Sequence, residues 1–200
     1  MKKLLFLGLF LSVGLQGICQ VGESTGLEFG FVQGGMTGFP GYSNGGLFSG
    51  AIFKEFMARK KDTNVPTVGG EFKLNWSYYS MDNGNGNSFY MNVYTLPVTF
   101  KVNLGSSWTH WTVKEGDEYK SYSMFRAIYL YAGPEAGYWQ TNATHAGTLN
   151  QVFGGAVGGV QVWINRFKID LYGHRSITPA TYTPGNDYIQ GAALSFGVAF

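Results

Sequence analysis

Apolar and polar side chains alternate along most of this chain. The clearest alternation lies at residues 71–79, where one face is apolar and the other polar or charged: Phe72, Leu74, Trp76 and Tyr78 against Glu71, Lys73, Asn75, Ser77 and Tyr79. Successive side chains of a β-strand point to opposite faces, so this pattern predicts a strand between an apolar and a polar environment. No apolar run after the first residues is long enough for a membrane-spanning helix, which needs about 20 residues.

The same periodicity and the turn residues between the segments predict about eight strands. We expect these strands at about residues 26–39, 47–58, 71–79, 94–104, 125–140, 151–163, 167–174 and 188–200. The phase of the second segment is ambiguous, since either of two sets could face outward: Phe48, Ile52 and Phe56, or Ala51, Phe53 and Met57. The predicted fold is all-β: a single closed, antiparallel, up-and-down transmembrane β-barrel.

The final segment has one large apolar face and one nearly bare face. Leu194, Phe196, Val198 and Phe200 alternate with Ala193, Ser195, Gly197 and Ala199. Small groups on the second face fit the crowded lumen of a narrow barrel. An ending on Phe200 resembles the terminal strand of bacterial outer-membrane β-barrels, which implies recognition by the barrel assembly machinery.

The first residues have the three parts of a secretory signal peptide. Lys2 and Lys3 precede an apolar run from Leu4 to Leu15, and small residues stand before Gln20. We therefore expect a signal peptide at 1–19 and the barrel domain at 20–200. Lipidation of Cys19 is the alternative, although the bulky Ile18 before it is unfavourable.

Composition supports a membrane barrel more than a soluble globule. Charged residues make up 13% of the chain, about half the usual share, and 30 of 200 residues are glycine. Without Lys2 and Lys3, the 14 basic residues of the full chain fall to equal the 12 acidic ones. A neutral chain with no basic stripe argues against nucleic acid as a partner. The only cysteine, Cys19, leaves with the predicted signal peptide, so no disulfide is expected.

Several segments, in order, resemble the PorT-like outer-membrane β-barrel domain family. They are Asn92–Asn103 with its Leu-Pro and Phe-Lys pairs, Tyr129–Gly137 with Ala-Gly-Pro, the glycine-rich Gly154–Gly159, Phe167–Tyr172 and the terminal Phe200. The resemblance implies an eight-stranded barrel in the outer membrane and no particular reaction. It also implies a short turn where this chain has the longer stretch Gly105–Ser123, whose centre, Lys114–Glu118, has the composition of a hairpin tip. We therefore expect the fourth and fifth strands to continue beyond the membrane.

Pro97 and Pro134 fall inside predicted strands. Proline removes a ladder donor, and a closed barrel has no edge to accommodate it. We therefore expect a β-bulge at each proline.

One arrangement could support catalysis. His174 and Ser176 share a face of the seventh predicted strand, as a base and a nucleophile could. Outer-membrane lipid A deacylases use a His-x-Ser pair on the outer wall, but the phase here turns both residues inward, where polar residues would satisfy one another. His110 and His145 have no ligands at metal-binding spacing. We predict no catalytic, cofactor or metal site and no cofactor.

The polar face predicts a lumen filled by paired charges, because isolated buried charges are costly. The predicted lumen set is Glu28, Glu71, Lys73, Asn75, Lys101, Glu135, Gln161, Lys168, Asp170 and His174. Rings near strand ends are expected at the membrane interfaces, namely Tyr78, Tyr94, Tyr138, Trp163 and Tyr188.

The sequence thus indicates a small, non-enzymatic integral outer-membrane barrel with a structural or surface-interaction role. Its expected partners are outer-membrane lipid, the assembly machinery and an unidentified envelope or extracellular protein. Two alternatives stay open: a lipid-modifying barrel enzyme using His174 and Ser176, and a soluble secreted barrel binding an apolar ligand. The soluble barrel would turn Phe72, Leu74 and Trp76 inward.

Overall fold

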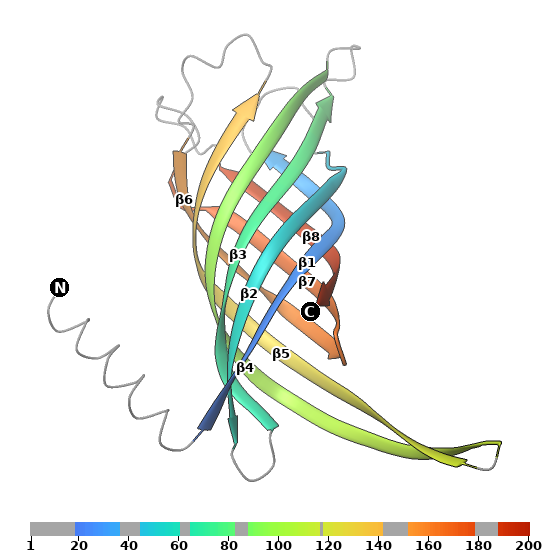
Figure 1. The fold of residues 1–200 in the computed structure, drawn as a ribbon. Helices are drawn as coiled ribbons and strands as arrows, with labels where there is room; N and C mark the ends of the chain where they lie inside the picture. Colours follow the sequence, from blue (N-terminus) through green and yellow to red (C-terminus); the bar gives the residue numbers. More distant parts are fainter. Residues whose placement is uncertain are drawn as a thin grey trace, which may run out of the picture.

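Eight antiparallel strands close into one barrel (Figure 1). The structure, a computed structural model, describes residues 19–36, 45–60, 65–82, 88–116, 118–141, 152–178 and 188–200. The strands are β1 (Cys19–Met36), β2 (Phe48–Lys60), β3 (Val65–Asp82), β4 (Ser88–Glu115), β5 (Glu118–Thr141), β6 (Val152–Ile164), β7 (Phe167–Ser176) and β8 (Ile189–Ala199).

Each strand pairs with its sequence neighbours, and β1 also pairs with β8. In the closing ladder Gly26 lies opposite Ala199 and Met36 opposite Ile189. The predicted closed up-and-down topology is therefore confirmed. Among the described residues, no helix is long and apolar enough to cross a bilayer.

Several strands extend further than the alternation predicted. β1 begins at Cys19 and β3 at Val65, because the hydrogen-bonded ladder continues past the apolar part of each strand. Asn165 and Arg166 form the tight turn between β6 and β7, with Asn165 at φ 54°. The predicted signal peptide, apart from Cys19, and the loop from Pro179 to Asn186 lie outside the described residues.

The two ends of the barrel differ in their connections. The end with the Asn165–Arg166 turn, here the turn end, also carries the connections after β2 and β4, at 61–64 and 116–117. The opposite end, here the loop end, carries the connections after β1, β3, β5 and β7, which together are longer. The two ends of the barrel can therefore be distinguished by the lengths of their connections.

A two-stranded arm leaves the turn end (Figure 1). β4 and β5 stay paired to Glu115 and Glu118, whereas β3 follows β4 only to Val102 and β6 follows β5 only from Arg126 onward. A register shift between Asn103 and Gly105 marks the root of the arm, and such irregularities bend strands. The predicted continuation of the two strands is confirmed, and the tip turns at Gly116 with φ 67°.

The bulges predicted at Pro97 and Pro134 are wrong. The ladder between β4 and β5 keeps one register from Pro97 opposite Glu135 to Phe100 opposite Ala132, with no extra residue in either strand. Regular pairing lapses between those two pairs because proline has no N–H to donate. The described register shifts lie instead at Ala58/Arg59 and at the arm root.

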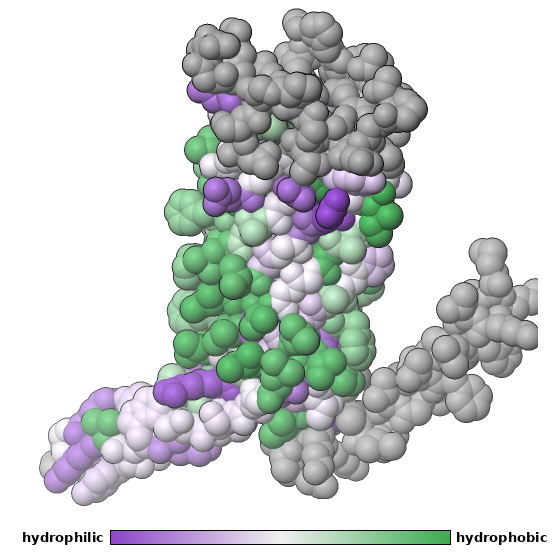
Figure 2. Space-filling view, turned by 180° about the vertical axis from the view of Figure 1, so that it is seen from behind, coloured by the Kyte–Doolittle hydropathy of each residue, from purple (hydrophilic) through white to green (hydrophobic). Residues whose placement is uncertain are grey.

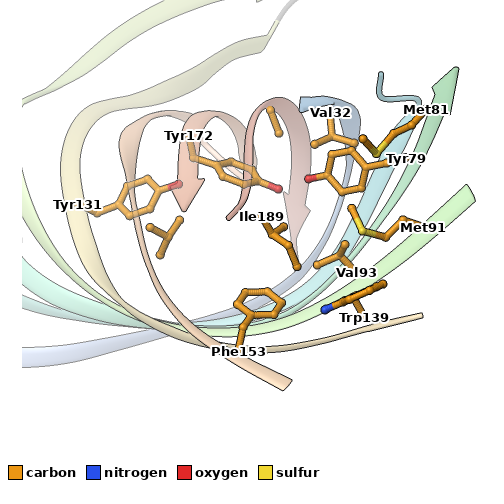
Figure 3. Packing of buried hydrophobic residues seen from close by; sticks show 12 residues of the cluster. Val32, Tyr79, Met81, Met91, Val93, Tyr131, Trp139, Phe153, Tyr172 and Ile189 are labelled. Carbon is orange, nitrogen blue, oxygen red and sulfur yellow. The ribbon is translucent and has the colours of Figure 1, made fainter. Parts of the chain in front are cut away.

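Side chains fill the barrel interior in three layers. A large apolar cluster occupies the loop end (Figure 3). Figure 3 shows the rings of Tyr131, Tyr172 and Tyr79 in a row across the lumen. A second, smaller cluster closes the turn end: Phe53, Met57, Ala127, Tyr129, Trp163 and Ala199. The buried lysines and their carboxylate partners lie between these two clusters, whereas Glu135 and His174 lie at the loop end beside Tyr79.

Candidate functional site

The outer wall of the barrel is apolar. Figure 2 shows a belt of hydrophobic residues on the barrel, whereas the arm is mostly pale or polar. Leu74 is 53% exposed on this wall, and its neighbour Lys73 is only 7% exposed. Large apolar residues of other strands share the outward face, including Phe29, Phe31, Ile52, Phe72, Leu96, Phe100, Leu130, Ile169, Leu171 and Phe196. The orientation required by the soluble-barrel alternative is therefore contradicted.

Outward aromatic rings gather near the loop end. The ring of Tyr78 stacks on those of Phe48 and Tyr90, with centroids 5.5 and 5.7 Å away. Tyr94 stacks on Tyr138 at 6.5 Å. The predicted outward positions of Tyr78, Tyr94 and Tyr138 are thus confirmed.

Trp163 does not belong to this outer group. Its side chain is 5% exposed and packs edge-on against Phe53 inside the barrel, with ring centroids 6.0 Å apart. The prediction for Trp163 is wrong because residues two apart share a strand face, and Gln161 already points into the lumen. At the turn end the outer wall instead carries phenylalanines, Phe167 and Phe200.

Lys73 stands at the centre of the buried charges. Its Nζ lies 2.7 Å from Asp170 Oδ2, 3.0 Å from Glu28 Oε2 and 3.4 Å from Glu71 Oε1. Tyr131 donates a hydrogen bond of 2.8 Å to the other oxygen of Asp170. Strands β1, β3, β5 and β7 are thereby connected through the lumen.

Two further lysines complete the network. Lys101 contacts Glu55 and also donates to Glu71 at 2.6 Å. Lys168 contacts Glu28, donates to Glu71 at 2.8 Å and lies 3.6 Å from the Phe53 ring centroid. Each ammonium group thus has at least two carboxylate partners, which offsets the cost of removing these charges from water. The predicted paired network is confirmed, and Glu55 is a member that the prediction omitted.

Glu28, Glu71 and Asp170 have oxygens within 4.8 Å of one another, a spacing that could hold a metal ion. Lys73 contacts all three carboxylates, and Lys168 contacts Glu28 and Glu71. These ammonium groups supply the positive charge at that point. The cluster is therefore explained by its lysines.

His174 is held by partners other than Ser176. Its Nδ1 lies 3.1 Å from Glu135 Oε1, and its Nε2 lies 3.0 Å from the Tyr79 hydroxyl. Ser176 Oγ accepts a hydrogen bond of 3.0 Å from the Ile189 backbone N–H. Both ring nitrogens are engaged, so the structure does not pair His174 and Ser176 as a base and a nucleophile.

All ten residues predicted for the lumen are buried. Strand β2 takes the first of its two possible phases, with Phe48 and Ile52 exposed and Phe53 and Met57 inside. This phase also turns Glu55 inward and leaves its neighbour Lys54 exposed. Because either phase would turn one of these two adjacent charges outward, the sequence held no signal for the position of Glu55. No catalytic constellation emerges among the described residues.

Comparisons with known proteins give weak likenesses. No family model matches the chain, and neither does any curated protein, so the PorT-like resemblance stays a prediction. Among solved structures, Neisserial surface protein A is 13% identical with a TM-score of 0.45, covering 90% of this chain and 99% of that one. Ail, the attachment invasion locus protein of Yersinia pestis solved with the heparin analogue sucrose octasulfate, is 8% identical with a TM-score of 0.41, covering 89% and 99%. The fold of the present chain is established by its own strand pairing.

Proposed function

We propose that the protein is an integral outer-membrane β-barrel with a structural or surface-interaction role and no catalytic activity. The observation that carries the proposal is the inverted wall of a closed barrel: apolar side chains point outward and ion pairs fill the lumen. A barrel satisfies every backbone group by pairing between strands, which is the condition for spanning lipid with strands.

Strand length supports this proposal. A tilted strand of about 9–11 residues crosses the hydrocarbon layer. β7 has 10 residues and β8 has 11. Along β7 the outward residues are Phe167, Ile169 and Leu171, and the apolar stretch ends before the exposed Arg175. The apolar part of the wall thus ends where headgroups would begin.

The packed lumen favours a structural role over transport. Lys101, Lys168, Asp170 and Gln161 are at most 1% exposed, and apolar clusters lie on both sides of them. An eight-stranded barrel has room for little beyond its own side chains. A solute would have to break several ion pairs to pass.

The connections support one orientation in the membrane. In outer-membrane barrels short turns face the periplasm and longer loops face outward. The turn end would therefore be periplasmic, together with the arm. The loop end would carry the surface-exposed connections.

Fractionation of cells that express the full chain tests the location. The protein should sediment with the outer membrane and resist extraction by carbonate and high salt. Its migration on an unheated gel should differ from that of the boiled sample, as expected for a stable barrel. Recovery in the soluble periplasmic fraction would contradict the proposal.

Planar bilayers test the filled lumen. The purified barrel should give no stable single-channel conductance, because ion pairs and two apolar clusters fill its lumen. Regular conductance steps from the unmodified protein would exclude a purely structural lumen.

A further inference from the structure

A cavity of about 220 Å³ lies at the turn end of the lumen, beside the root of the arm. Its lining comes from several strands and includes Arg59, Met57, Tyr129, Trp163, Arg166 and Phe125. The cavity is bounded by Met57, Tyr129 and Trp163 of the turn-end cluster and by Glu55, which contacts Lys101. None of the residues of the loop-end cluster lines it.

Two buried hydrogen-bond donors beside this cavity have no partner. They are the indole Nε1 of Trp163 and the guanidinium Nε of Arg59, two of the four such side-chain atoms among the described residues. Trp163 is 5% exposed, so its N–H is withdrawn from bulk water. Buried polar groups in folded proteins nearly always have partners, so these two donors call for a bound water, ion or ligand.

The charges around the cavity favour an anion. Arg59 and Arg166 line it, and no carboxylate of the described residues pairs with either guanidinium. The two acidic residues in the lining are already used: Glu23 pairs with Lys54 at 3.1 Å, and Glu55 contacts Lys101. Guanidinium groups bind carboxylates through paired N–H donors.

Part of the remaining lining is apolar. Met57, Phe125, Tyr129 and the Trp163 ring belong to this part, whereas Ser24 and Asn165 add polar groups. A volume of 220 Å³ corresponds to about seven water molecules at about 30 Å³ each, which is ample for an aromatic acid. The cavity thus combines an anion-binding side with an apolar side.

Gly22 provides the space for Arg59. A Cβ at position 22 would lie 2.5 Å from Arg59 Nε, so the guanidinium rests directly against the β1 backbone. A side chain here would push Arg59 out of its present position.

We propose that this turn-end cavity binds a small organic anion, a carboxylate on an aromatic or apolar stem, through the Trp163 indole N–H and the Arg59 guanidinium. Arg166 adds positive charge at the rim, and the apolar lining holds the stem. This inference goes beyond the proposed location in the membrane. Binding is measured on the purified full chain, so its result is independent of fractionation.

Benzoate is the probe, and the neutral benzamide is its matched comparison. Fluorine NMR with 4-fluorobenzoate and 4-fluorobenzamide, on the folded protein in detergent micelles, measures both affinities, with protein-free micelles as the blank. Saturable binding of the benzoate, at least tenfold tighter than that of the benzamide, is expected because a charged hydrogen bond is lost with the amide.

Three variants locate the site. Trp163→Phe keeps a ring but removes the N–H, and Arg59→Met keeps an apolar stem but removes the charge. Each should weaken benzoate binding about tenfold while changing benzamide binding little. Arg175→Gln is the matched control, since this exposed arginine lies over the Tyr188 ring at the loop end, and it should bind like the parent protein.

Heat-dependent gel mobility confirms that each variant is folded. If Arg59→Met fails to fold, Trp163→Phe and the ratio of benzoate to benzamide affinity still decide. If the folded parent protein shows no saturable binding of the benzoate, water alone is the partner of the Trp163 and Arg59 donors, and the inference is overturned. Equal affinity for benzoate and benzamide, or unchanged benzoate binding by Trp163→Phe, would overturn it as well.

Discussion

Lys73 of β3 and Asp170 of β7 form an ion pair of 2.7 Å across the lumen, although 97 residues separate them in the sequence. Side by side with Lys73, Leu74 points to the opposite face and is exposed on the apolar wall. These neighbours therefore report on two environments, the charged interior and the outer surface. Substituting each one separately distinguishes the roles of the two faces.

Lys73→Met should destabilise the barrel by about 3–5 kcal/mol, because it leaves buried carboxylates without their counter-ion. Asp170→Asn in the same chain should restore part of that loss. The matched control is Lys54→Met, which breaks the exposed pair with Glu23 and should cost at most about 1 kcal/mol. Urea unfolding in lipid vesicles, followed by tryptophan fluorescence, measures all three. An equal loss of unfolding free energy for Lys73→Met and Lys54→Met would show that the lumen ion pairs stabilise the barrel no more than an exposed pair does.

Leu74→Arg should destabilise the membrane-inserted barrel by about 2–4 kcal/mol, because it places a charge near the middle of the apolar belt. Val113→Arg is the control, since Val113 is exposed on the arm, away from the belt. It should be nearly neutral in the same vesicle unfolding assay. A Leu74→Arg protein as stable as the parent would mean that lipid does not cover this face.

Gly26→Ala should destabilise the barrel by about 1–3 kcal/mol through overpacking. A Cβ at position 26 would lie 2.2 Å from the Val198 carbonyl oxygen and 2.5 Å from the Phe53 ring. Gly105→Ala is the control, because nothing lies within 4 Å of a Cβ there. Thermal unfolding in detergent compares the two variants, and a neutral Gly26→Ala would show that β1 can move away from β8.

The tip of the arm should become less stable at acidic pH. Lys120 donates a hydrogen bond to Glu115, as does Tyr122, and these bonds hold the pKa of the Glu115 carboxyl below its usual 4.5. A lowered pKa in the folded arm means that the stabilisation is complete above about pH 4.5 and is lost as the pH falls through the lowered value.

Hydrogen exchange of the amides at 111–122, measured from pH 6 down to about 3 and corrected for intrinsic rates, tests this dependence. Glu115→Gln should remove most of the pH dependence while leaving the exchange of barrel amides unchanged. A tip whose protection is constant over that range, or a variant that keeps the full dependence, would contradict the assigned role of Glu115.

Local alternation was sufficient to predict the fold and most of the two faces. Lys73 and Leu74 could be assigned to opposite sides because side chains alternate strictly along a strand and the two sides of this wall differ sharply in polarity. The arm could also be predicted, because the residues after Gly105 no longer form an apolar face but still have the composition of a hairpin. Trp163 could have been placed correctly by the same rule, from its spacing to Gln161.

Only the tertiary structure decided which groups meet. The sequence placed Lys73 in a lumen of paired charges, and the structure shows that its shortest contact is to Asp170 across the barrel. Such contacts depend on the register of all eight strands and on closure, which period-two patterns do not specify. The phase of β2, the unbulged prolines and the cavity beside Arg59 and Trp163 depend on the same long-range geometry. Local periodicity determined which way each side chain points, and barrel closure determined what it contacts.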